Sequence, residues 1–250
     1  MAVTGVLMGM YFSGIPWMQN FVAPAGNREF GALENLEHLI ILAVVWVAVR
    51  GIYGKRSKRE KVVFAGVAFG SFFLFLEELD YGIHYLELIT GEAYQGKVRN
   101  LHNYILNPYG LDFDALLSPV VYFILGFFFC FLPLIGLQSL RSGLVRRFPE
   151  TFVPRLLANP WFRYLTPEPH SMGTVAAMVL IAQVAFFLDK TGVPSNLSFH
   201  GNISEFGEVF VHYIFFLYVI EMVYKRKSPH SHSVESEAQN RQKLFTKRVS

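Results

Sequence analysis

Long apolar runs, separated by short polar, basic or proline-rich stretches, dominate the pattern of hydrophobic and polar positions in this chain. A helix needs about 20 consecutive, mostly apolar residues to cross the hydrocarbon core of a bilayer. An unbroken helix satisfies its own backbone hydrogen bonds there, and the runs lack the alternation typical of a membrane barrel. The pattern predicts an all-α fold, a polytopic transmembrane helical bundle of about six spans. The expected spans are 3–22, 32–52, 62–88, 115–140, 172–188 and 206–224.

The composition is that of a membrane protein. Hydrophobic residues make up 52% of the 250 residues and charged residues 16%, whereas a soluble domain carries about 25% charged residues. The stretch 226–250 is polar, with too few apolar residues to pack. We therefore expect a transmembrane helical domain over 1–225 and a disordered polar cytoplasmic tail over 226–250. Cys130 is the one cysteine, which excludes an intrachain disulfide.

Small residues inside the apolar runs predict where helices approach one another. Two glycine pairs with three residues between them would let neighbouring helices pack closely, within this chain or between two copies. The pairs are Gly5 with Gly9 and Gly66 with Gly70.

Basic residues gather in alternate connections between the expected spans. They are dense in 54–61, recur through 141–170, and follow the last span as Lys225, Arg226 and Lys227. Short loops rich in Lys and Arg stay on the cytoplasmic side of a membrane. These three connections and both termini are therefore expected inside, and the location expected is a cell membrane, the bacterial inner membrane. The opposite connections hold Arg28, Lys97, Arg99 and Lys190.

The inner stretch 141–170 also carries aromatic residues among its arginines. They are Phe148, Phe152, Trp161, Phe162 and Tyr164. This mixture suits a segment that lies on the anionic inner leaflet. A solvated loop with the usual cytoplasmic excess of positive charge explains the same residues, so both interpretations stay open.

Ionisable residues within the expected spans gather at the ends opposite the basic connections. The second span begins with Glu34, Glu37 and His38; the third ends with Glu77, Glu78, Asp80 and His84; the sixth begins with Glu205, Glu208 and His212. A charged side chain inside a span costs about 3 kcal/mol on insertion scales, so such residues usually face the bundle interior or an aqueous cavity.

The spacing of these residues predicts stripes on helices. Glu77, Asp80 and His84 stand at i, i+3 and i+7, which places them on one narrow face of a continuous helix. The same spacing recurs in the sixth span at Glu205, Glu208 and His212. Three antiparallel helices would then present carboxylates and imidazoles to one another at a similar depth.

A divalent metal would neutralise such a cluster. Helical bundles build di-iron and di-manganese sites from inward-facing Glu and His, and mixed sets also suit zinc. The expected cofactor is therefore Zn, Fe or Mn. The candidate ligands are Glu37, His38, Glu77, Asp80, His84, Glu208 and His212. The candidate general bases are Glu78 and His102, the latter in an outer connection.

Other interpretations explain the same carboxylates without a metal. Glu34 and Glu205 stand at helix starts, where a negative charge interacts favourably with the helix dipole. Lys97 or Arg99 could pair with the acidic residues in a network of ion pairs and hydrogen bonds. A path for protons or cations would also place ionisable groups inside spans.

Three stretches resemble the motifs of a family of uncharacterised bacterial multi-span membrane proteins. In that family an acidic helix start is followed by Glu-Trp, a helix ends in Glu-Glu-Ile-Ser-Trp-Gly-Gln-Arg, and Asn-Leu-His-Asn follows. The matching stretches here are 34–38, 77–84 and 100–103, and the last is a full match. The departures are Asp80 for Ser, Tyr81 for Trp, Ile83 for Gln and His84 for Arg.

The resemblance covers the middle third of the chain and, through the acidic start 204–208, the sixth span. It implies the multi-span topology and one constellation, formed by Glu37, Glu77, Glu78, His102 and Asn103. It implies no reaction. The departures at 80 and 84 add a carboxylate and an imidazole to the constellation.

Two classes of function follow. The first is a metal-dependent enzyme at the outer leaflet: a hydrolase of an ester or amide in a lipid-like substrate, or a di-iron-type oxidoreductase. The second is not an enzyme, but an accessory subunit of a membrane complex or a proton or cation carrier. The partners expected are the lipid bilayer, a lipid-like substrate or other membrane proteins, and not nucleic acid. Phosphate-binding loops, His-Glu-x-x-His and Gly-x-Ser-x-Gly motifs are absent from the sequence.

Overall fold

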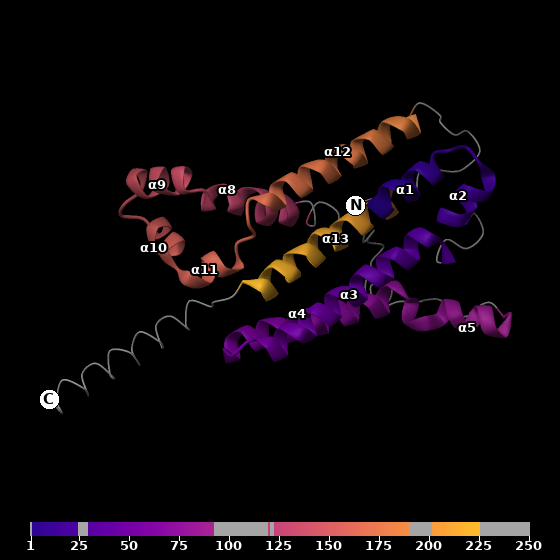
Figure 1. Cartoon of the computed structure of the whole chain (residues 1–250), viewed down its shortest axis with the longest axis horizontal. Helices are drawn as coiled ribbons and strands as arrows, with labels where there is room; N and C mark the ends of the chain where they lie inside the picture. The colour runs from indigo at the N-terminus through magenta and orange to yellow at the C-terminus, as the bar shows by residue number, and fades with distance from the viewer. Residues whose placement is uncertain (1, 25–29, 93–119, 121–122, 191–201, 226–250) are drawn as a thin grey trace, which may run out of the picture.

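The computed structural model describes residues 2–24, 30–92, 120, 123–190 and 202–225, and every regular element in these ranges is a helix (Figure 1). The first elements are α1 (Ala2–Tyr11), α2 (Pro16–Val22), α3 (Ala32–Gly54), α4 (Lys58–Glu78), the 3-10 turn η2 (Asp80–Gly82) and α5 (Ile83–Thr90). They are followed by the π-helical η4 (Gly126–Phe131), α8 (Leu132–Gly136), α9 (Gln138–Arg147), α10 (Phe152–Ala158), α11 (Pro160–Leu165), α12 (His170–Lys190) and α13 (Asn202–Tyr224). The predicted all-α class is confirmed for the described residues.

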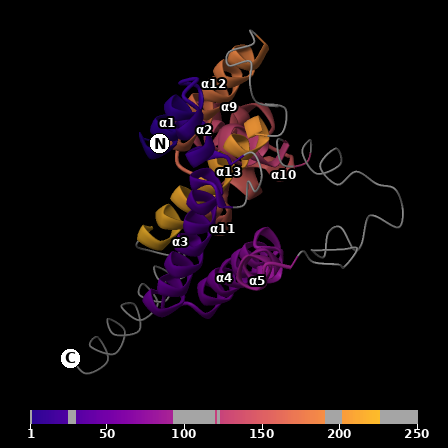
Figure 2. The same cartoon turned by 90° about the vertical axis from the view of Figure 1, so that its right-hand side faces the viewer.

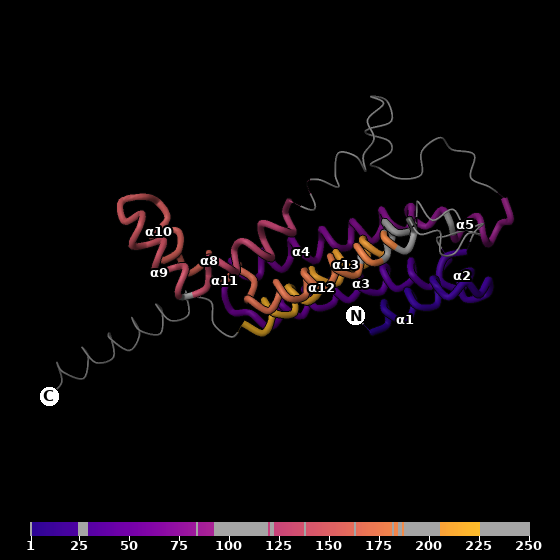
Figure 3. The backbone as a smooth tube through the Cα atoms, turned by 90° about the horizontal axis from the view of Figure 1, so that it is seen from above, coloured from indigo at the N-terminus to yellow at the C-terminus, as the bar shows by residue number. Residues whose placement is uncertain are grey.

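Four long helices pack in the order α4, α3, α13 and α12, which Figures 2 and 3 show from two further directions. Each contact buries one apolar stripe. On α3 the stripe runs through Ile41, Val44 and Ala48, which are almost completely buried. Val209 and Val219 on α13 are buried in the same core. Residues three, four and seven apart share one face of a helix, so a single side of α3 forms this interface.

Two helices are long and apolar enough to cross a membrane. They are α3, with a mean hydropathy of 1.8, and residues Phe206–Tyr224 of α13, with 1.6. Two bent pairs raise the number to as many as four: α4 with η2 and α5, and Phe123–Gly136 with Ser139–Arg147. The described residues therefore support two to four of the approximately six spans expected.

The first apolar stretch, 3–22, does not form the single helix that we predicted. α1 ends at Tyr11 and α2 begins at Pro16, and the two short helices pack against each other. Between them Gly14 has a left-handed φ of 72°, which a helix cannot contain, and a proline begins α2. Neither helix alone reaches the length that a bilayer core requires.

Breaks also interrupt two other expected spans. α4 stops at Glu78, and the helix that follows it leaves at 59°. In the fourth span the described helix ends at Gly136 and turns by 84° into α9. The fifth stretch lies within α12, whose described apolar part, His170–Ile181, is shorter than a spanning helix. The predicted tail, 226–250, lies outside the described residues.

The basic connections meet at one end of the bundle. Lys55, directly after α3, donates to the backbone carbonyl of Lys225 at 2.7 Å, and its ammonium lies 5.6 Å from the ring of Tyr164 in α11. Burial lowers the pKa of Lys55, an effect that the nearby Glu60 carboxylate opposes. Residues from all three basic connections therefore lie side by side, while α2 and α5 lie at the other end (Figure 1).

α3 and α4 pack tightly at Gly51. A Cβ built on this glycine would lie 2.7 Å from the ring of Phe64, which is fully buried. A Cβ on any glycine of the two predicted pairs, by contrast, would meet nothing within 4 Å. The prediction that those pairs mediate close packing within the chain is therefore wrong; Gly51 has this role.

Gly51→Ala is expected to lower the free energy of unfolding by about 1–3 kcal/mol, because the added methyl overpacks a buried contact. Gly70→Ala, in the open middle of α4, is the matched control and should be neutral or gain about 1 kcal/mol from helix propensity. Thermal and denaturant unfolding in detergent micelles measures both. Equal effects of the two substitutions would contradict this account of the contact.

Candidate metal site

Glu37 lies in the buried stripe of α3, one turn after the buried Leu33. It follows the first turn of the helix, and only 1% of its surface is exposed. Ile41 and Val44 continue the same face toward the middle of the bundle. The carboxylate therefore lies where the sequence pattern of α3 places an apolar side chain. A charged group in that position needs partners from the neighbouring helices.

The end of α4 places Glu78 beside α3. Three consecutive residues after it have left-handed φ angles: 46° at Asp80, 55° at Tyr81 and 85° at Gly82. This conformation costs about 1–2 kcal/mol for a residue with a side chain. Such strain persists only where the surrounding structure enforces it, and it is frequent at functional sites.

The side chains of Tyr81 and Asp80 in this turn contact the rest of the protein. The hydroxyl of Tyr81 donates a hydrogen bond to Oε1 of Glu77, so Glu77 is held within the turn. Asp80 is buried, with 8% of its surface exposed. The turn closes with the backbone amide of Gly82 donating to the carbonyl of Leu79 at 2.8 Å.

The third side of the site comes from α13. Glu208 and His212 are four residues apart and therefore share one face of this helix. Glu208 is exposed, whereas the side chain of His212 is only 15% exposed. The site is thus buried on the α3 side and open on the α13 side.

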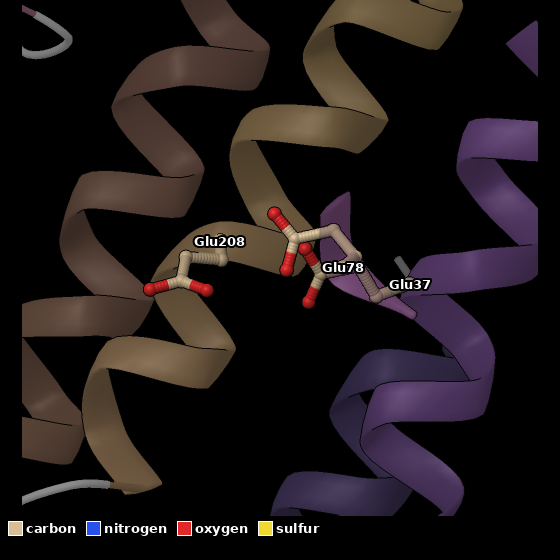
Figure 4. Close-up of side chains that lie close together, drawn as sticks. All are labelled: Glu37, Glu78 and Glu208. Atoms are coloured by element: carbon tan, nitrogen blue, oxygen red, sulfur yellow. The ribbon is translucent and has the colours of Figure 1, made fainter. Parts of the chain in front are cut away.

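The three helices bring Glu37, Glu78 and Glu208 together (Figure 4). One carboxylate oxygen from each lies within 4.8 Å of the others. Nδ1 of His212 lies 2.8 Å from Oε1 of Glu37, and this histidine also interacts electrostatically with Glu78 and Glu208. We call these four residues the carboxylate cluster.

The carboxylate cluster fits a small divalent cation. Metal–oxygen distances of about 2.0–2.6 Å place ligand atoms up to about 5 Å apart across an ion. Three carboxylates are hard donors, which suit Mn, whereas an added imidazole, such as that of His212 next to Glu37, would suit Fe or Zn. Without a cation, three carboxylates so close together would repel one another.

Comparisons with known proteins do not assign this site. No family model, curated protein or solved structure matches the chain. The resemblance to the uncharacterised bacterial family therefore stays a prediction. Its fully matching motif, 100–103, lies outside the described residues, together with the candidate base His102.

The predicted site residues divide into two groups. Glu37, Glu208 and His212, proposed as ligands, lie together, and Glu78, proposed as a general base, lies among them. Sequence spacing missed this position of Glu78 because it assumed that α4 continues as one helix. The predicted stripe of Glu77, Asp80 and His84 is wrong, since the left-handed turn places these residues in three successive elements, α4, η2 and α5.

His38 has a different environment from the cluster. Its Nε2 lies 4.0 Å from Oε1 of Glu34, and its ring stands edge-on to Phe75 with 5.9 Å between ring centroids. It is therefore packed within the α3–α4 interface. The backbone of His84 lies in α5, but its side chain is outside the described part of the chain.

The contact between Glu37 and His212 predicts a strong energetic coupling. In a double-mutant cycle with Glu37→Gln and His212→Asn, measured with a chelator present, we expect about 1–3 kcal/mol of coupling, because the two side chains touch in a buried interface. The control cycle, Glu34→Gln with His38→Asn, joins atoms 4.0 Å apart and should give a smaller value. Denaturant unfolding in micelles measures both cycles; additive effects at Glu37 and His212 would refute the contact.

Proposed function

We propose that this chain is a membrane-embedded enzyme that uses a divalent metal to act on a lipid-like substrate. The observation that carries the proposal is the convergence of Glu37, Glu78 and Glu208 from three separate helices within 4.8 Å. His212 would complete the ligand set, since it contacts Glu37 and faces the same space. Ionisable groups inside apolar helices are costly, and a functional site explains why they are present.

Each residue of the carboxylate cluster would have a separate part. Glu37, buried between α3 and α13, would fix the position of the ion, while the exposed Glu208 would lie at the entrance for water. A metal ion supplies a Lewis acid that makes bound water more acidic at neutral pH. Glu-rich bundle sites also hold di-iron centres, so a di-iron-type oxidoreductase is the variant of this proposal.

A nearby cleft supports a lipid-like substrate. It measures about 630 Å³ and lies between α1, α2 and the start of α3. Its walls are mostly apolar, with Leu7, Phe21 and Leu36 among them, and Asn20 and Asn35 supply amide groups. Leu36 directly precedes Glu37, so an acyl chain in this cleft would lie next to the helix that carries the cluster.

The proposal includes the finer topology expected from the sequence. We propose that the basic connections lie in the cytoplasm of a bacterial cell, which would place the carboxylate cluster near the outer face. The support is the separation of charges in the structure: basic connections share one end, and the cluster comes from the opposite ends of α3, α4 and α13.

Metal analysis of the purified protein tests this function. We expect stoichiometric Zn, Fe or Mn, and a metal affinity about 10- to 100-fold lower in Glu78→Gln and in Glu208→Gln, since each loses an anionic ligand. Glu92→Gln, an exposed carboxylate after α5, is the matched control and should bind metal normally. The proposal fails if the protein holds no stoichiometric metal and both variants match the control.

The same variants distinguish an enzyme from a carrier. A carrier for protons or cations would release its ion from the partly exposed cluster to either side of the membrane, and this would be measured as flux in liposomes. Glu208→Gln would abolish the flux, because it removes one of the carboxylates that bind the ion. An enzyme would show no flux. It would instead cleave or oxidise a lipid extract in a reaction that requires the added metal.

A further inference from the structure

The helix α9 runs across the long axis of the bundle, at the end of the bundle where the basic connections lie. The helix before it, which includes α8, follows the long axis, and α9 leaves that helix at 84° (Figure 1). If the long helices cross a membrane, α9 lies almost in the plane of its surface. A helix in that plane presents one side to the headgroups and acyl chains.

The surface of α9 combines apolar and basic side chains. Leu140 within α9, and Leu137 and Phe148 at its two ends, are between 37% and 47% exposed. Arg141 and Arg147 belong to the same helix. Long arginine side chains beside an apolar face can keep their stems in the acyl region and their guanidinium groups at the headgroups.

The helix α10 repeats this arrangement. Phe152 is 71% exposed and Leu156 39%, four residues apart on the outward side, while Leu157 is buried. Arg155 lies exposed next to them. The sequences 138–147 and 152–158 contain no acidic residue. Such a surface would be poorly solvated in water, but it is complementary to an anionic lipid layer.

Hydrogen bonds attach this segment firmly to the bundle. The hydroxyl of Tyr218 donates to the carbonyl of Leu165 at 2.6 Å, and Nζ of Lys225 donates to the carbonyl of Thr166 at 2.8 Å. The backbone amide of Glu168 donates to the carboxylate of Glu221 at 3.0 Å. The end of α11 is thus fixed to α13. Since α10 packs against both α11 and α9, this attachment also holds α9 and α10 in position.

We infer that α9 and α10 form a binding surface for anionic phospholipid headgroups on the membrane face at the basic end of the bundle. Arg141, Arg147 and Arg155 bind the phosphate groups, and Phe148 and Phe152 enter the acyl boundary. This surface lies at the opposite end from the carboxylate cluster, and the inference is independent of the proposed metal function.

A single fluorescent label tests the position of the surface. The full-length chain carries Cys130→Ser and Leu156→Cys labelled with an environment-sensitive dye, in nanodiscs of phosphatidylcholine with or without phosphatidylglycerol. We expect a blue-shifted emission that nitroxide-labelled lipids quench, more strongly with phosphatidylglycerol. Emission typical of water in both nanodiscs would overturn the inference. Shielding from water without quenching by lipid would also overturn it, since a protein partner or second copy would then cover α10.

Charge variants test the choice of lipid. Replacing Arg141, Arg147 and Arg155 with Gln should lower the preference for spin-labelled phosphatidylglycerol over phosphatidylcholine by about fivefold per arginine at low salt. The control replaces Arg56, Lys58 and Lys61 with Gln, which removes the same charge from another connection at that end. A drop of the same size in the control would assign the preference to net charge and overturn the inference.

Discussion

The burial of Glu37 between α3 and α13 is the constraint on which the arrangement of this protein depends. A carboxylate with 1% of its surface exposed is stable only if neighbouring groups compensate for the water that it loses. Nδ1 of His212 lies 2.8 Å from Oε1 of Glu37, and a shift of α13 by one turn would separate the two side chains. The apolar stripes allow several registers between the two helices, but this polar contact favours one.

The strained turn after α4 follows from the same constraint. If the helix continued past Glu78, Tyr81 would follow on the same face as Glu78. The turn instead ends α4 at Glu78, holds Glu77 through Tyr81 and directs α5 away at 59°. The left-handed φ angles at two residues with side chains show that the surrounding packing outweighs their local cost. A carboxylate from a third helix thereby reaches Glu37.

The bundle has two chemically different ends. At one end lysines and tyrosines donate hydrogen bonds to backbone carbonyls, and the flanking helices α9 and α10 expose arginines beside aromatic side chains. At the other, carboxylates converge with an imidazole. Between them the helix contacts are apolar. This difference between the ends underlies the two proposals, in which the first end binds anionic lipid and the second binds a cation.

The sequence by itself determined the helical class, the apolar stretches that became α3 and α13, and the residues Glu37, Glu208 and His212, because periodicity and the cost of buried charge are local properties. It did not determine where the helices break. Gly14 and Pro16 interrupt the first expected span through their own backbone preferences. The left-handed turn at Asp80 and Tyr81 interrupts the third, since packing against other elements outweighed the local preference for helix. Only the tertiary structure decided that Glu78 joins the carboxylate cluster and that Gly51 allows α3 and α4 to touch. Both depend on contacts between residues distant in sequence, which the spacing along one helix does not contain.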